Sequence, residues 1–167
     1  YMHEELRRQA ERALQDHGML LQSVINSSPD LITIKDTEHR YRFANLAAAR
    51  AMHLTPEQMV GKSALDVKLD PASTLGDGAD IARKMLAIDR EVMASGQTER
   101  LADQTLLIHG EPRICDILKV PMRDRQDRVW GVLEFVQDIT LRRQAEASLR
   151  SHEGHLQLLF DHAPVAL

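Results

Sequence analysis

The feature that most constrains this chain is an internal repeat near its two ends. Residues 6–29 align without gaps with residues 141–164, at a spacing of 135 residues, and eleven of the 24 aligned pairs are identical. Both copies are rich in Ala, Leu, Glu, Gln and Arg, and proline occurs only at their last position, so each is predicted to begin with a long helix. One module therefore lies between two copies of the same connecting helix, and we expect the sequence to be a piece of a longer array.

An apolar stripe runs along both predicted helices. Five positions of each helix lie on one face and carry the same residues in both copies; they are positions 6, 10, 14, 17 and 21, and 141, 145, 149, 152 and 156. Because alanine and histidine interrupt the stripe, a lone helix would be marginal in water. We expect a parallel homodimer to supply the missing burial through Leu6, Leu14, Leu21, Leu141 and Leu149. The alternative is a helix that packs on its own domain.

Composition excludes several classes of protein. The chain has 25 acidic and 21 basic residues, which argues against a nucleic-acid partner, since such surfaces need a basic excess. Cys115 is its one cysteine, so an internal disulfide framework and a multi-cysteine metal site are excluded. The sequence has no run of 18 apolar residues. We expect a cytoplasmic location, with any membrane anchor of the parent protein outside this sequence.

The region between the repeats changes from strands to helices. Residues 31–35 and 40–44 have the composition and alternation of short strands, and residues 36–39 between them predict a hairpin turn. Asn45 is a suitable N-cap for a short helix over 46–53. Pro56 then suits the first position of a further helical turn, which Gly61 ends.

The second half of the module predicts one long helix and three strands. The helix covers 77–95, with Ile81, Met85, Ile88 and Val92 on its core-facing side, Asp77 or Asp80 as its cap and Gly96 at its end. The strands are expected at 99–108, 113–122 and 129–138, and their short loops imply antiparallel pairing. One sheet with a single helical layer is an α+β fold.

Several motifs in this order resemble the PAS domain with its C-terminal PAC strands. The matching segments are SPDL at 28–31, KD at 35–36, Asn45, PEQMVGK at 56–62, LKVPMRD at 118–124, Gly131 and DIT at 138–140. Two hairpin turns depart from the family pattern, which often has Asp-Gly there. Here residues 38–39 are Glu-His and residues 126–127 are Gln-Asp, so any left-handed residue in these turns must carry a side chain.

The resemblance implies a five-stranded antiparallel sheet with helices on one face around a small pocket. It divides the chain into a linker or coiled-coil helix at 1–22, a PAS/PAC domain at 23–140, a signalling helix at 141–158 and the truncated start of a second PAS domain at 159–167. It also implies a sensory or relay module of a bacterial signalling protein of the histidine-kinase or cyclic-di-GMP type. The expected partners are a second copy, neighbouring PAS and effector domains, and an unidentified small molecule.

No cofactor or catalytic residue is identified. Relatives that form a cysteine–flavin adduct carry a Gly-x-Asn-Cys-Arg type segment, which is missing here, and Cys115 falls in a strand. Relatives that bind haem use a histidine of the long helix, and residues 77–95 contain none. No phosphate loop, nucleophile elbow or metal-ligand set is found, so we expect the fragment itself not to be an enzyme. A small enzyme with the same layout would need a catalytic pair that the sequence does not offer.

Five charged residues are candidates for binding a ligand in the pocket. They are Lys35, Arg83, Asp116, Lys119 and Glu134. Strand alternation separates Asp116 and Leu118 from Ile117 and Lys119, but it does not say which face is inside. Lys119 and Glu134 could form a cross-strand pair on the outer face, or one or more of the five could point inward and hold a polar ligand.

The joint between the last strand and the second connecting helix is predicted to transmit the signal. Asp138 or Thr140 can cap that helix, and Asp138 can pair with an arginine, of which Arg142 is the closest in sequence. The alternative is that these residues only end a strand and start a helix. For the whole module, the alternative to ligand sensing is a ligand-free domain that acts in dimerisation and signal relay.

Overall fold

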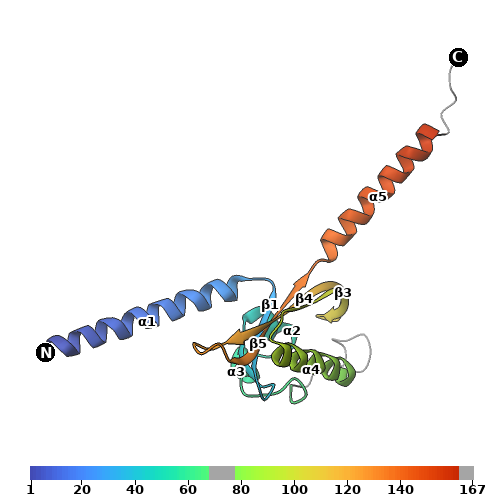
Figure 1. Ribbon diagram of the computed structural model, residues 1–167. Coiled ribbons are helices and arrows are strands. Elements are labelled where there is room, and N and C mark those ends of the chain that lie inside the picture. Colours follow the sequence, from blue (N-terminus) through green and yellow to red (C-terminus); the bar gives the residue numbers. More distant parts are fainter. Residues whose placement is uncertain (68–77, 162–167) are drawn as a thin grey trace.

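The computed structural model describes residues 1–67 and 78–161. In chain order the elements are α1 (Met2–Ser27), β1 (Leu31–Asp36), β2 (Tyr41–Ala44), α2 (Leu46–Ala51), α3 (Pro56–Met59), α4 (Gly78–Ser95), β3 (Glu99–Ile108), β4 (Glu111–Arg123), β5 (Val129–Asp138) and α5 (Thr140–Asp161). The strands form one antiparallel sheet in the order β2-β1-β5-β4-β3. Helices α2, α3 and α4 cover one face of it, while α1 and α5 extend away (Figure 1). The expected sheet with helices on one face is confirmed.

The apolar core lies between the helices and the inner face of the sheet. One cluster joins β2 to α2 and α3 through Tyr41, Ala48 and Met59, and a second gathers around Cys115 and Ile117. Alternation along the strands produces this arrangement, because residues two apart share a face. Cys115 is buried in the sheet as the sequence predicts, and burial raises the pKa of its thiol to about 11.

Local sequence explains the helix starts near β2. The Asn45 side chain accepts a hydrogen bond from the Ala48 N–H, which makes it the N-cap of α2. The same side chain reaches β1 by accepting from the Ile32 N–H at 3.1 Å. Thr55 and Gln58 form a capping box around α3, with Pro56 at its first position. These predicted helix starts are therefore confirmed.

Both hairpin turns contain a left-handed residue with a side chain. His39 has φ 61° and Asp127 has φ 63°. An aspartate precedes each by three residues and organises the turn: Asp36 Oδ1 accepts two backbone N–H bonds in the first hairpin, and Asp124 Oδ1 accepts two in the second. These hydrogen bonds offset the strain of an αL residue that is not glycine.

Gly131 shows a different use of glycine, the close approach of two strands. A Cβ added at this position of β5 would lie 2.3 Å from the Lys35 carbonyl oxygen of β1. Any larger residue would push β1 away from β5. The start of β1–β5 pairing therefore depends on glycine at this position.

Several predicted boundaries are wrong. Glu111 and Pro112 belong to β4 and not to a loop, because the connection after β3 needs only the turn at residues 109–110. Helix α2 ends at Ala51. Asp80 lies inside α4 and binds Arg83, so it is not the helix cap.

Other expectations fall partly or wholly outside the described residues. The alternative cap Asp77 lies outside them. Helix α5 continues to Asp161, and the remainder of the expected second domain at 159–167 also lies outside them. Within the described part of the chain, no helix combines the length and the apolar character needed to cross a membrane.

Candidate functional site

Four charged side chains meet between α4 and the inner face of the sheet. Lys35 comes from β1, Lys119 from β4, Glu134 from β5 and Asp89 from α4. Strand pairing brings the three sheet residues together, because Lys119 lies directly opposite Glu134, and Lys35 lies opposite Val132, two residues from Glu134 on the same face of β5. We call these four residues the buried quartet.

Asp89 links the two lysines of the quartet. Lys35 Nζ donates to Asp89 Oδ2 at 2.8 Å, and Lys119 Nζ donates to Asp89 Oδ1 at 2.5 Å. Lys119 also donates to Glu134. The Lys119 side chain is 0% exposed and that of Glu134 is 14% exposed, so the two ammonium groups depend on these carboxylates in place of water.

The quartet stabilises the charged forms of Lys35 and Glu134. Burial by itself would raise the pKa of Glu134, but the ammonium groups of Lys35 and Lys119 outweigh it and lower that pKa to about 2. Burial opposes the charge of Lys35, but Glu134, Tyr41 and Asp89 raise the pKa of this lysine overall. The nearby Tyr41 ring, 5.4 Å from Lys35 Nζ, is buried too, which raises its own pKa to about 12.

A mainly apolar cavity of about 120 Å³ borders the quartet. Its wall includes Lys35, Glu134 and Thr33 from the sheet, Met85 from α4 and residues 106–108 from β3. A second cavity of about 210 Å³ borders Lys35 and Asp89 on another side, where His39 and Arg90 line it. Lys35 thus lines both cavities, while Glu134 lines the first and Asp89 the second.

Three of the five predicted site residues lie in the quartet. Lys35, Lys119 and Glu134 point inward, so the predicted Lys119–Glu134 pair is present but its placement on the outer face is wrong. Arg83 is exposed and pairs with Asp80 on α4. Asp116 lies on the outer face and pairs with Arg100.

Asp89 is the member of the quartet that sequence reasoning missed. The predicted stripe of α4 consists of apolar residues only, whereas the buried face also contains Asp89, four residues before the half-buried Met93 and three before the buried Val92. A charged residue at a core-facing helical position was the available signal. Such a residue predicts a buried partner, since an unpaired charge would not persist there.

The joint between β5 and α5 is built from side-chain hydrogen bonds. Asp138 Oδ1 accepts from the Thr140 N–H at 2.9 Å, at the start of α5, and from the Thr140 hydroxyl at 2.6 Å. The hydroxyl in turn accepts from the Ile114 N–H of β4 at 2.9 Å. Asp138 therefore caps the helix start as predicted, while Thr140 ties that start to the sheet.

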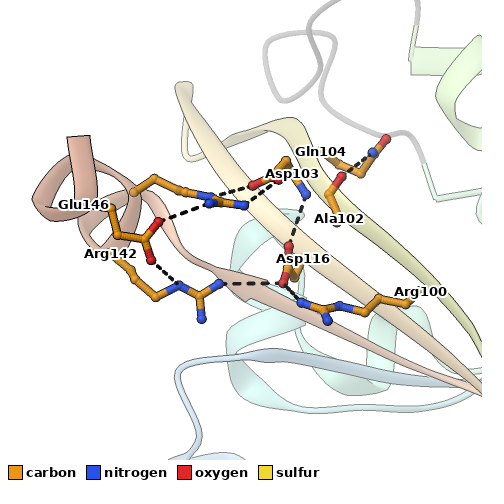
Figure 2. A network of polar contacts seen from close by, with 8 residues as sticks. Arg100, Ala102, Asp103, Gln104, Asp116, Arg142 and Glu146 are labelled. Carbon is orange, nitrogen blue, oxygen red and sulfur yellow. Dashed lines mark hydrogen bonds and ion pairs between the residues drawn. The ribbon is translucent and has the colours of Figure 1, made fainter. Parts of the chain in front are cut away.

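Asp138 does pair with an arginine, but the partner is Arg113 and not Arg142, the closest in sequence. Asp138 lies 3.8 Å from Arg113, and Arg142 lies 3.8 Å from Asp116 (Figure 2). The reason is the direction of the helix, which carries Arg142 past the end of β5 and over β4.

Asp103 is a second residue that the sequence analysis missed. It lies in β3 where the register with β4 shifts, and its φ is 53°. The bulge aims its carboxylate at α5, where Arg143 binds it through Nε–Oδ1 at 2.7 Å and Nη2–Oδ2 at 2.5 Å. Its N–H donates to Asp116 Oδ1, and Figure 2 shows the network that results.

Asp116 is the centre of that network on the outer face. Hydrogen bonds from the Arg100 side chain and the Asp103 N–H lower the pKa of Asp116. Glu146 of α5 accepts from Arg143 at 3.1 Å, so the first turns of α5 are held to β3 and β4 by a set of paired charges. We call the Asp103–Arg143 contact the helix latch.

The five leucines predicted to form a dimer interface are all exposed in the single chain. They are Leu6, Leu14, Leu21, Leu141 and Leu149. Helix α1 contributes no buried residue. Their role stays a prediction.

Among the residues that the structure describes, no three His, Cys, Asp or Glu side chains are grouped as metal ligands would be.

Known proteins resemble this chain in sequence and in fold. The virulence sensor protein BvgS of Bordetella parapertussis is 29% identical over 136 residues, which cover 81% of this chain and 10% of that protein. BvgS of Bordetella pertussis is 28% identical over 148 residues, or 89% of this chain and 11% of that protein. The chain thus spans about a tenth of the length of the curated relatives it matches.

Solved structures agree with the fold. The PAS domain of B. pertussis BvgS matches with a TM-score of 0.61 and 23% identity, over 84% of this chain and 98% of that one. A structure of VqmA bound to DPO matches with a TM-score of 0.62 and 23% identity, over 73% of this chain and 57% of that one. A family model described as "PAS fold" matches residues 25–144. The chain therefore belongs to the PAS-fold family.

Proposed function

We propose that this module senses a small molecule in the apolar cavity and passes the signal through α5 to an output domain. The observation that carries the proposal is the double role of β3. Residues 106–108 of this strand line the cavity, and Asp103 of the same strand holds Arg143 at the start of α5. A displacement of β3 by a bound molecule would therefore reach the helix directly.

The position of β3 supports this route. It is an edge strand of the sheet, and β4 is its neighbour in the strand order. An edge strand can shift with the loss of fewer ladder hydrogen bonds than a central strand. Two solved structures with the same fold belong to proteins with relevant roles. One is VqmA bound to DPO, and the other is the PAS domain of BvgS, which is named a virulence sensor protein.

The parent protein is proposed to be a multidomain signalling protein with an output of the histidine-kinase or cyclic-di-GMP type. The resemblance to the PAS family and the small share of BvgS that this chain spans support this proposal. Within this proposed parent protein, the present chain has no catalytic role, acts as a homodimer and adjoins further PAS and effector domains. No nucleic-acid partner is proposed, given the net charge of −4.

The second candidate function is a ligand-free relay that only dimerises and transmits strain. One observation favours it: the apolar stripe of α1 is exposed along its length, so the helix has surface available for another chain. The two functions differ in one respect. In sensing, a molecule bound in the cavity changes how firmly α5 is held to the sheet, and in relay it does not.

Native mass spectrometry with hydrogen exchange tests the proposal. We expect the natively purified chain to retain a small molecule and amide exchange in residues 140–150 to increase when that molecule is removed. Exchange in residues 2–20, which are far from the cavity, is the internal control. If no mass is retained and no cavity-sized probe alters exchange in 140–150, sensing is overturned and the relay function remains.

A further inference from the structure

The charges beside the apolar cavity balance within the protein. Two ammonium groups and two carboxylates form the buried quartet, and every member has an oppositely charged partner in it. Lys35 and Glu134 are the charged side chains among the described residues on the cavity wall. The protein therefore offers no uncompensated charge to a molecule that enters.

A charged molecule would lose hydration in this cavity without gaining a counter-charge. An added carboxylate near Lys35 would also face Glu134 and Asp89, and an added ammonium near Glu134 would face both lysines. Moving an ion into mainly apolar surroundings costs several kcal/mol unless it is paired. The quartet therefore selects against both anions and cations.

The hydrogen-bonding groups on the cavity wall define the polar part of the molecule. Glu134 is the most exposed carboxylate of the quartet, at 14%, compared with 1% for Asp89, and a carboxylate can only accept. The Thr33 hydroxyl lies close enough to Glu134 to help lower its pKa, yet it has no regular hydrogen-bond partner among the described residues. A ligand hydroxyl or amide could donate to Glu134 and accept from Thr33.

The size of the cavity limits the rest of the molecule. A buried apolar cavity of about 150 Å³ holds a benzene ring, and this one measures about 120 Å³. We propose that the cavity takes a neutral molecule of roughly benzene size, mainly apolar, with one hydroxyl or amide group directed at Glu134 and Thr33. This inference rests on the proposed sensing function and names the chemical class of its ligand.

A series of probes with one common ring tests the charge rule. We would titrate the chain with benzyl alcohol, toluene, benzyl methyl ether, benzoate and benzylamine and follow backbone amide shifts by NMR. Shifts at Leu106 and Ile117 report the apolar cavity, and shifts at His39 and Leu86 report the second cavity. We expect benzyl alcohol to bind the apolar cavity about tenfold more tightly than benzoate or benzylamine, and several-fold more tightly than toluene or the ether.

Two reciprocal variants change the charge balance by one unit each. Glu134→Gln leaves the quartet with an excess positive charge, so benzoate should gain affinity relative to benzyl alcohol. Lys35→Met leaves an excess negative charge, so benzylamine should gain instead. Glu57→Gln, an exposed substitution on α3 with the same change in net charge as Glu134→Gln, should leave the wild-type order intact. If one variant fails to fold, the other variant and the wild-type series still show whether the charge balance of the quartet sets the ligand preference.

The outcomes separate this inference from the proposed function. If benzoate or benzylamine binds the wild-type cavity as tightly as benzyl alcohol, the neutral class is overturned while sensing stands. An unchanged order of affinities in both folded variants also overturns the inference, because the quartet would then not set the preference. If none of the five probes shifts Leu106 or Ile117 at millimolar concentration, the cavity is not a ligand site and both are overturned.

Discussion

Lys119 is the residue on which the electrostatics of the domain depend most. It is fully buried and donates to both carboxylates of the quartet. A lone Lys119–Glu134 pair at this depth would be a poor source of stability, because desolvation offsets the attraction. Asp89 changes this balance because it gives Lys119 a second carboxylate partner and also pairs with Lys35, and it ties α4 to β1 and β4 at the same time.

The substitution Lys119→Met tests this dependence. It leaves two carboxylates facing one ammonium in a buried site, so we expect a loss of about 3–5 kcal/mol in the free energy of unfolding, measured by urea denaturation. Adding Glu134→Leu restores the charge balance and should recover a large part of the loss. A double variant as unstable as Lys119→Met would mean that shape, not charge, determines the effect.

Glu134 also predicts how stability depends on pH. Its pKa is lowered from 4.5 to about 2 in the folded chain. A carboxyl with a depressed folded pKa stabilises the protein above its ordinary pKa, and this contribution is lost as the pH falls from about 4.5 to about 2. The wild-type urea midpoint should therefore fall over this range more steeply than that of Glu134→Gln. Equal slopes would contradict the depressed pKa, and Glu57→Gln should keep the wild-type slope.

At the scale of elements, the helix latch determines how α5 leaves the sheet. Arg143 binds the carboxylate of Asp103 with two hydrogen bonds, which favours one direction of the guanidinium and hence of the helix. The latch depends on the β3 bulge, because a regular strand would turn Asp103 to another side. Both side chains are partly exposed, so solvent screens the pair and limits its effect on overall stability.

The substitution Asp103→Asn should loosen α5 without unfolding the domain. We expect roughly two- to fivefold faster amide exchange in residues 140–147. The exposed ion pair of Arg7 and Glu11 offers a control, since Glu11→Gln removes a comparable interaction on α1. Unchanged exchange in 140–147 would mean that the latch does not hold the helix.

Asp138 and Thr140 make a separate prediction at the same joint. Asp138→Ala removes the cap of α5 and should cost about 1 kcal/mol. Thr140→Val leaves the Ile114 N–H without its acceptor, at a cost of about 1–3 kcal/mol. Both variants should stay folded, as measured by circular dichroism. The output of the parent protein should respond less to its stimulus in each. Normal regulation in both folded variants would show that these side chains transmit nothing.

At the scale of the whole molecule, α1 leaves an apolar stripe exposed in the single chain. Helix α1 has 26 residues and none of them is buried, although its stripe carries Leu6, Leu14 and Leu21. An amphipathic helix with no apolar partner gains little from its own propensity. A parallel pair of α1 helices from two copies would bury this stripe.

Sedimentation of a double variant tests the dimer. Leu14→Glu with Leu21→Glu places charges in the proposed seam, and these side chains are exposed in the single chain, so the fold should remain intact while the dimer dissociates. Gln15→Glu with Gln22→Glu adds the same charge on the opposite face of α1 and should stay dimeric. If the leucine variant sediments with the parent mass, α1 is not the interface.

The sequence alone was sufficient for the elements and their order. Helix composition in the repeats, the cap at Asn45, Pro56 at the first position of its helix, and the period-2 alternation of the strands are local properties, and local hydrogen bonding and sterics enforce them. For the same reason the separation of Lys119 from Asp116 was correct. The boundary errors, such as Pro112 in a strand, arose where pairing with a neighbouring strand extended an element beyond its local signals.

Only the tertiary structure decided which face of the sheet is inside. Lys119 and Glu134 are compatible with either face, because a charged pair on the outer face needs no further partner. Their burial depends on Asp89, which lies 30 residues before Lys119 and 54 residues after Lys35 in the chain. The latch likewise joins Asp103 to an arginine 40 residues away through a bulge with no local signal. Buried charges need partners that packing supplies across the fold, and no periodicity within one element encodes them.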